Sequence, residues 1–288
     1  MASTQQLRQR IQSVKNTKQI TKAMEMVAAS KLRRAQDAAT SSREFAKLAN
    51  ELLTRIRQLT DVNKHPLFAR RAIKSRLMIV VASDRGLAGA YNTMVLKKFA
   101  EELKNDDDAN IKNEVITVGK KATNFVAKLH DVTLKAVYHD FSDSPTAEDL
   151  RPILITAIDG FKKGEFDAVD VFFTDFISSI NQQPRSARLL PVAFDDVDLP
   201  AHLKDAPFEP SPKKVLDEVT ERFVEVQMMQ YMLESAASEH SSRMIAMKNA
   251  TDNANDITDD LTLALNTARQ AAITQELAEI TGGAEAIS

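Results

Sequence analysis

The C-terminal part of the chain carries a long repeat of apolar positions. From Val219, alternating steps of four and three residues lead to Ala272, and twelve of the sixteen positions on this path are apolar. The polar exceptions are Gln230, His240, Thr251 and Thr258. An apolar repeat of 3.5 residues sustained over seven heptads is typical of a coiled-coil seam. The pattern therefore predicts one long helix that packs lengthwise against another helix.

The N-terminal part is also helical in pattern, but its apolar positions are less regular. Leu7 begins a stripe at helical spacing that continues through Met24 to Ala35. A later group at similar spacing comprises Phe45, Leu48, Leu52 and Ile56. We expect both groups to face the C-terminal helix. Because the two arms lie at opposite ends of the chain, an antiparallel coiled coil is the simplest arrangement.

The middle of the chain alternates short apolar runs with amphipathic segments. Strands are predicted at 77–82, 114–118, 133–138, 168–173 and 187–194, and helices at 95–103, 121–129 and 146–162. Strands that alternate with helices favour an open, mainly parallel, Rossmann-like α/β sheet. Residues 106–108 (Asp-Asp-Asp) and the proline-rich segment 200–212 are predicted to be exposed loops.

Glycine and proline divide the chain at the same places. Neither occurs in residues 1–65 or 213–281, whereas 66–212 hold fourteen of the sixteen. Since these residues interrupt helices, we predict an N-terminal coiled-coil helix (1–65), an α/β domain (66–212) and a C-terminal coiled-coil helix (213–288). The formal charge is +8 in 1–65 and −7 in 213–288, although the whole chain carries only −2. Two arms of opposite charge favour pairing with each other.

Composition narrows the possible chemistry. The absence of cysteine excludes disulfides, thiolate catalysis and Cys-ligated metal sites. No apolar run approaches the roughly 20 residues of a membrane span. Gly86 and Gly89 follow a predicted strand, but their GxxG spacing matches neither phosphate-binding fingerprint. A tight strand–helix turn is the preferred interpretation, and we expect no catalytic residue, metal or cofactor site in this chain.

Several segments, in order along the chain, resemble one known family. These are residues 20–32 (ITKAMEMVAASKL), 83–87 (SDRGL), 242–247 (SRMIAM), 265–270 (LNTARQ) and 273–286 (ITQELAEITGGAEA). They are similar to the gamma subunit family of bacterial F-type ATP synthase, the central rotor shaft of its catalytic head. The resemblance covers essentially the whole chain.

This resemblance implies a mechanical role at a membrane. It implies that two antiparallel helices turn inside a ring of three alpha and three beta subunits. The α/β domain would contact the epsilon subunit and, at its foot, the membrane ring of c subunits. One copy would couple proton flow to ATP synthesis or hydrolysis. It would be a peripheral, non-catalytic subunit on the cytoplasmic side of the bacterial inner membrane. It would also help to regulate ATPase activity and proton flow.

The resemblance also implies roles for particular residues. Met24, Arg243 and Gln270 match family positions at the contact between shaft and catalytic ring. Phe208 and Glu209 fall where the family's foot meets the c-ring. The residues of an apolar tip that would turn as a bearing are Ile273, Ile280, Ala284 and Ile287. From the residues alone, Met24 could equally be seam packing, and Arg243 and Gln270 could simply stabilise the helix pair.

Two other classes of protein stay open from the residues alone. A coiled-coil scaffold or nucleic-acid-binding protein would use the basic first arm and would bind DNA in a salt-sensitive manner. A nucleotide-dependent enzyme would use the α/β domain and would bind ATP as an isolated chain. Co-purification with alpha and beta subunits would distinguish the rotor from both.

Overall fold

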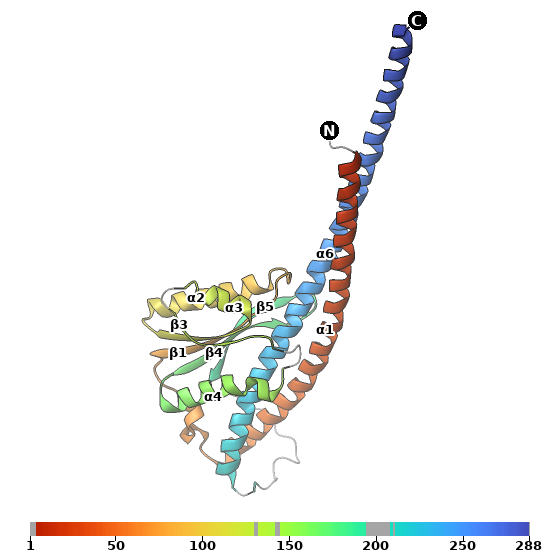
Figure 1. Ribbon diagram of the computed structural model, residues 1–288. Coiled ribbons are helices and arrows are strands. Elements are labelled where there is room, and N and C mark those ends of the chain that lie inside the picture. Colours follow the sequence, from red (N-terminus) through yellow and green to blue (C-terminus); the bar gives the residue numbers. More distant parts are fainter. Residues whose placement is uncertain (1–3, 130–131, 142–144, 194–207, 210, 288) are drawn as a thin grey trace. The chain divides into compact units, whose positions relative to one another are not determined.

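The computed structural model describes residues 4–129, 132–141, 145–193, 208–209 and 211–287 (Figure 1); the side chains of 63 and 283–287 lie outside the description. The chain forms two compact units, residues 1–28 with 243–288, and residues 29–242. Helices α1 (Thr4–Leu59) and α6 (Pro212–Ile287) contribute to both units. Among the described residues, no helix is long and apolar enough to cross a membrane.

Residues 29–242 are built around a five-stranded sheet in the order β3-β2-β1-β4-β5. The strands are β1 (Ser75–Val81), β2 (Lys112–Val118), β3 (Thr133–Tyr138), β4 (Ala168–Phe176) and β5 (Gln182–Leu190). Strands β3, β2, β1 and β4 run parallel, and β5 pairs antiparallel with β4. The predicted mainly parallel α/β sheet is therefore confirmed.

Helices cover both faces of this sheet (Figure 1). Helices α2 (Tyr91–Asp108) and α3 (Lys120–Val126) pack on one face, where Phe99 and Phe172 meet edge to face at 5.5 Å. Helix α4 (Ala147–Lys163) packs on the other face together with parts of α1 and α6. Residues of β1 alternate between the two cores, with Leu77 and Ile79 in one and Met78 in the other. Because β1 is covered on both faces, its successive residues are apolar, which explains the continuous apolar run in the sequence.

In residues 29–242, α1 and α6 run antiparallel. Arg43 pairs with Glu234 at 3.0 Å, and His65, just after α1, lies 3.3 Å from Asp217. Two short 3₁₀ turns, η1 (Val62–Lys64) and η2 (Pro66–Phe68), connect α1 to the sheet. The predicted antiparallel arrangement of the helical arms is confirmed.

The predicted apolar stripe on the second half of α1 is partly wrong. Phe45 and Leu48 are 57% and 56% exposed, whereas Ala49, Leu53 and Ile56 are buried. The buried positions continue the alternating three- and four-residue steps of the first half, through small residues such as Ala39 and Ala49. The size of an apolar side chain does not decide the buried face, because alanine can form a close helix contact as well as leucine can.

Residues 106–108 are not an exposed loop, since α2 extends through Asp108. Asp106 is buried and lies 3.3 Å from Arg76 of β1, which also contacts Glu102 and Asp170. Burial raises the pKa of Asp106, although the Arg76 guanidinium opposes this effect. The prediction failed because a run of acidic residues looks like solvated chain, and only the fold reveals a buried arginine beside it.

The predicted strand at 187–194 is also displaced. Strand β5 begins earlier, at Gln182, and stops at Leu190 because Pro191 follows. Its first half is polar since it lies at the edge of the sheet, where side chains remain largely exposed. Phe194, the last residue of the predicted strand, lies outside the described residues. Residues 200–207 of the predicted loop 200–212 also lie outside them, and Pro212 already belongs to α6.

Candidate docking and coupling surfaces

Residues 4–28 of α1 and 243–287 of α6 form a helix pair with a partly polar seam. Leu7, Ala28, Met247 and Ala254 are buried apolar residues of this pair. A hydrogen bond of 2.8 Å joins the hydroxyls of Thr21 and Thr251, both of which are buried. Thr251 was one of the polar exceptions in the heptad repeat, and its partner on α1 accounts for it. Buried polar groups are retained where such a partner exists.

The three residues expected at a shaft-to-ring contact do not form one cluster. Met24 and Arg243 are half-buried, and Gln270 is exposed. Arg243 and Gln270 are 27 positions apart on α6, which corresponds to roughly 40 Å at 1.5 Å rise per residue. They therefore mark separate levels of the helix pair.

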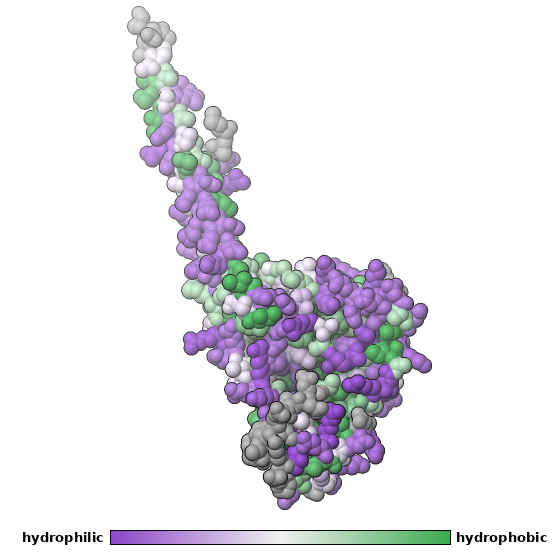
Figure 2. All heavy atoms as spheres, turned by 180° about the vertical axis from the view of Figure 1, so that it is seen from behind, coloured by the Kyte–Doolittle hydropathy of each residue, from purple (hydrophilic) through white to green (hydrophobic). Residues whose placement is uncertain are grey.

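The end of α6 is exposed on all sides. Every residue from 269 to 282 is exposed, including Ile273 at 47% and Ile280 at 68%. Apolar and polar surface alternates along this end of the helix (Figure 2). Ala284 and Ile287 belong to α6, but their side chains lie outside the described residues. A helix that buries no face of its own normally gains stability from a partner.

The side of α6 that meets the sheet was not anticipated from the sequence. Ser235, Ser238 and Ser241 are buried, and Ser242 is half-buried. Their hydroxyls contact α2, β4, β5 and the β4–β5 turn. We call these four residues the serine face. Four serines within eight residues were a signal in the sequence. The serine hydroxyl competes for backbone hydrogen bonds and disfavours a helix interior, so serines there indicate contacts outside the helix.

Two aromatic rings and a buried carboxylate lie beside the serine face. Tyr231 stacks on Phe173 of β4 with ring centroids 4.5 Å apart, and burial raises the pKa of Tyr231 to about 12. Glu234 is buried, accepts hydrogen bonds from Gln230 and Arg43, and has a pKa raised mainly by burial. These contacts tie α6 to the sheet on one side and to α1 on the other.

The loop after β1 is a tightly hydrogen-bonded turn. The Asp84 carboxylate accepts backbone N–H bonds from Lys120 at 3.0 Å and Asp140 at 2.9 Å. Asn92 of α2 accepts the Ser83 backbone N–H at 3.0 Å. At this carboxyl end of the parallel strands, where α/β folds often bind phosphates, a side-chain carboxylate already takes the backbone donors. The loop therefore joins the ends of three strands.

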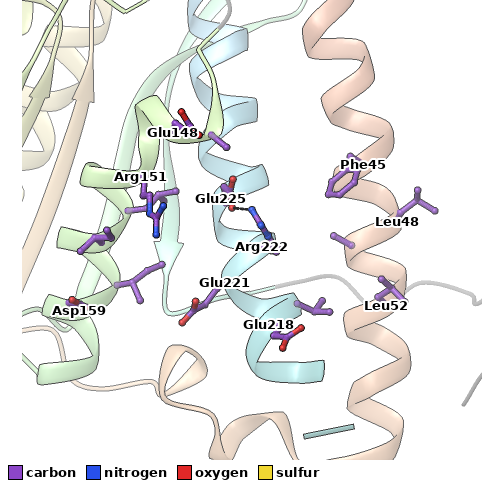
Figure 3. A pocket seen from close by; sticks show the side chains of 16 residues that line it. Phe45, Leu48, Leu52, Glu148, Arg151, Asp159, Glu218, Glu221, Arg222 and Glu225 are labelled. Carbon is purple, nitrogen blue, oxygen red and sulfur yellow. Dashed lines mark hydrogen bonds and ion pairs between the residues drawn. The ribbon is translucent and has the colours of Figure 1, made fainter. Parts of the chain in front are cut away.

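An open groove of about 1080 Å³ lies among α1, α4 and α6 within residues 29–242 (Figure 3). The exposed Phe45 and Leu48 line it together with Leu52, Ile155 and Val219. Its rim carries five acidic and two basic residues, and two of the rim residues, Arg222 and Glu225, pair at 2.6 Å. Phe45, Leu48 and Leu52, which were predicted to face the C-terminal helix, are thus part of an accessible surface.

The two residues expected at the foot lie just before α6. Phe208 is half-buried and packs against the main core, and Glu209 is exposed. Among the described residues, no group of three or more His, Cys, Asp or Glu side chains is arranged to hold a metal ion.

Comparison with known proteins gives matches over the full length. The family model described as ATP synthase matches residues 3–287. The chain is 39% identical over 292 residues to the ATP synthase gamma chain of Ralstonia nicotianae, and 38% identical over 288 residues to that of Stenotrophomonas maltophilia. Both alignments cover 100% of this chain and of the relative.

Two solved structures of mitochondrial ATP synthases share this fold. One is the central stalk and c-ring of Tetrahymena thermophila mitochondrial ATP synthase, with a TM-score of 0.61, 24% identity, and coverage of 80% of this chain and 99% of that chain. Another is the OSCP/F1/c-ring structure of Euglena gracilis mitochondrial ATP synthase, with a TM-score of 0.66, 16% identity, and coverage of 99% and 94%. The full-length sequence matches show that this chain belongs to the ATP synthase gamma chain family.

Proposed function

We propose that this chain is the central-stalk rotor subunit of a proton-translocating F-type ATP synthase. Its membership of the gamma chain family over the whole length carries this proposal. The long paired helices support it, because a pair of packed helices resists bending and twisting better than a single helix. In this proposal residues 1–65 and 213–288 act as the shaft, and residues 66–212 act as its base.

The proposed role is mechanical, and the chain supplies no catalytic residue. One copy turns inside a ring of three alpha and three beta subunits, and ATP is made or hydrolysed in that ring. The base contacts the epsilon subunit and the c-ring, and through these contacts the chain helps to regulate ATPase activity and proton flow. It is a peripheral subunit on the cytoplasmic side of the bacterial inner membrane, which it meets only through the c-ring.

Met24, Arg243 and Gln270 are proposed to contact the catalytic ring at separate levels of the shaft. The exposed position of Gln270 and the half-buried Met24 and Arg243 support such contacts. Arg243→Glu should lower the number of protons pumped per ATP hydrolysed, and the exposed Lys248→Glu is a matched control on the same helix. Unchanged pumping in Arg243→Glu would remove this residue from the coupling contact.

The exposed end of α6 is proposed to turn as an apolar bearing. Ile273 and Ile280 support this role because their side chains are 47% and 68% exposed and offer apolar surface to a sleeve. Ala284 and Ile287 continue the same segment. Charged substitutions at Ala284 and Ile287 should slow rotation or block assembly, because a charge is costly to bury in an apolar sleeve.

Phe208 and Glu209 are proposed to contact the c-ring loops. The exposure of Glu209 supports a contact of this residue, whereas Phe208 would also support the base from within. Glu209→Lys should therefore reduce ATP-driven proton pumping in membranes while ATP hydrolysis by the detached catalytic head stays normal.

Purification of the tagged chain from membranes tests the whole proposal. We expect alpha and beta subunits at three copies each per copy of this chain, with coupled ATP hydrolysis. Recovery of the chain alone from cells with an intact ATP synthase would refute it. Salt-sensitive DNA binding or ATP binding by the isolated chain would instead favour a scaffold protein or an enzyme.

A further inference from the structure

The serine face joins α6 to the sheet through side chains on one side of the helix. Tyr231, Ser235, Ser238 and Ser242 follow each other at steps of four, three and four, so they share a face. Leu233 and Ala237 occupy the heptad seam instead. The segment 231–242 of α6 therefore packs in two directions, with one face toward α1 and another toward the sheet.

At β4, two serines take both backbone groups of a single residue. The Thr174 N–H donates to the Ser235 hydroxyl at 3.4 Å, and the Ser238 hydroxyl donates to the Thr174 carbonyl oxygen at 3.1 Å. The pairing of β1 with β4 ends at Phe172, before Thr174. Helix α6 thus supplies hydrogen-bond partners to β4 beyond the end of its pairing with β1.

About one and a half turns further along α6, the same face holds the β4–β5 turn. The Ser241 hydroxyl donates to the Ser179 carbonyl oxygen at 2.8 Å, and the Ser242 hydroxyl donates to Gln182 Oε1 at 3.1 Å. The other end of the Gln182 amide donates to the turn carbonyls of Ser178 and Ser179 at 3.1 and 2.6 Å. The turn and the helix are therefore joined through both a backbone and a side-chain contact.

The Ser235 hydroxyl also contacts α2, because it lies 2.8 Å from the Tyr91 hydroxyl. The serine face consequently binds the sheet, the turn and the first residue of α2. Hydrogen bonds prefer a particular distance and direction, whereas the hydrophobic effect that drives apolar contacts is non-directional. Contacts at Ser235 and Ser242 are about 10 Å apart along the helix at 1.5 Å per residue, so they oppose both rotation and sliding of the domain on α6.

We propose that the serine face is the link that transmits torque between the α/β domain and α6, and that the two turn as one body. This inference rests on the proposed rotor function. Ser235, Ser238, Ser241 and Ser242 act as positioning residues, since they hold the domain in register with the shaft and touch no reacting group. Without them only the apolar core would hold the domain on α6, and rotation of the domain would turn the rest of α6 less efficiently.

The first test removes the hydroxyls in the complete ATP synthase. Ser235→Ala/Ser238→Ala/Ser242→Ala should lower the protons pumped per ATP at least two-fold in purified, intact complexes, while hydrolysis continues. The matched control is Thr40→Ala/Ser41→Ala, whose hydroxyls bond to carbonyls of their own helix at 2.9 and 3.3 Å. Reduced stability alone would lower the yield of complex but not the pumping ratio. A pumping ratio equal to that of the unmodified complex would overturn the inference.

The second test uses the absence of native cysteine. In the unmodified background, the two cysteines of Ser179→Cys/Ser241→Cys can be linked by oxidation to a disulfide or by a short bismaleimide. This cross-link should leave pumping intact, because it joins the β4–β5 turn to α6 and the two are proposed to turn as one body. In the alanine background, where the variant assembles, the same bond should restore the pumping ratio, and reduction of the disulfide should abolish the rescue. Loss of turnover on closure in the unmodified background would mean that the domain must move on α6, and would overturn the inference.

The outcomes also separate this inference from the proposed function. If the complex with unmodified chain does not couple ATP hydrolysis to proton pumping, the rotor function itself fails. If that complex is coupled and the serine and cysteine variants behave against expectation, only the torque link fails.

Discussion

Gly119 is the position where one added methyl group should do the most damage. It follows β2, has φ of +95°, and is the N-cap residue just before α3. A Cβ built there would lie 2.0 Å from the Ala82 carbonyl oxygen and 3.1 Å from the Ser83 carbonyl carbon. Those atoms cannot move freely, because the Ala82 N–H bonds to Val118 at 2.9 Å and the Ser83 carbonyl accepts the Lys121 N–H at 3.0 Å.

The magnitude follows from two costs. A non-glycine residue held in this backbone region costs about 1–3 kcal/mol, and forcing an extra carbon into a packed site costs about 1–3 kcal/mol more. Gly119→Ala should therefore lower the free energy of unfolding by about 2–6 kcal/mol. With a urea dependence of about 3 kcal/mol per molar, the midpoint should fall by about 0.7–2 M.

Tyrosine fluorescence during urea unfolding measures this effect in the right part of the chain. The chain has no tryptophan, and Tyr91, Tyr138 and Tyr231 all lie in residues 29–242. Gly86→Ala is the matched control in the neighbouring loop, because its Cβ would meet nothing closer than the Lys121 amine at 4.0 Å. Its effect should stay within about 0.5 kcal/mol. Equal midpoints for the two variants would refute the steric reasoning.

Three further predictions concern packing, pH and the exposed end of α6. Leu53→Ala removes a fully buried side chain and should lower the free energy of unfolding in urea by about 2–5 kcal/mol. Leu48 is 56% exposed, so Leu48→Ala should lower it by less than about 0.5 kcal/mol. The reverse order would contradict the buried face of α1. Burial lowers the pKa of His65, so the unfolded chain binds more protons below about pH 6.5, and stability should fall as pH drops from 7 to 5. His65→Asn, which keeps an acceptor for the Leu67 N–H, should flatten this dependence, and an unchanged slope would show that other groups cause it. Ile280→Lys should leave unfolding within about 0.5 kcal/mol of the unmodified chain but slow ATP turnover in the complex, and normal turnover would argue against an apolar bearing.

Periodicity in the sequence was sufficient for the main elements of the fold. The heptad path on α6 predicts its buried side, since fifteen of the sixteen positions are buried or half-buried and only Ala272 is exposed. The apolar run at 77–82 predicts β1, because a strand covered on both faces has no polar positions to interrupt it. Strand β3 coincides with the predicted range 133–138. These features depend on local repeats, which are visible in a single sequence.

Contacts between distant segments could not be predicted in the same way. Serine at 235, 238, 241 and 242 has no periodic signal that identifies its partners, since those lie sixty or more residues earlier in β4, β5, the β4–β5 turn and α2. The sequence predicts that Asp106 is exposed, and only the fold shows that Arg76 lies beside it. Hydrogen-bond partners and burial depend on which segments the fold brings together. The order of residues in the sequence does not give the distance in space between two such segments.

The sequence by itself determined the two long helices, four of the five strands, the opposite charges of the two arms and the family. Only the tertiary structure decided which side of α1 is buried, because alanines and leucines at overlapping helical spacings offered two possible faces. It also decided that Gly119 must be glycine, since the limiting atom belongs to Ala82, which follows β1. Local repeats determine the elements, whereas the atoms that neighbouring elements bring together determine the cost of changing any one residue.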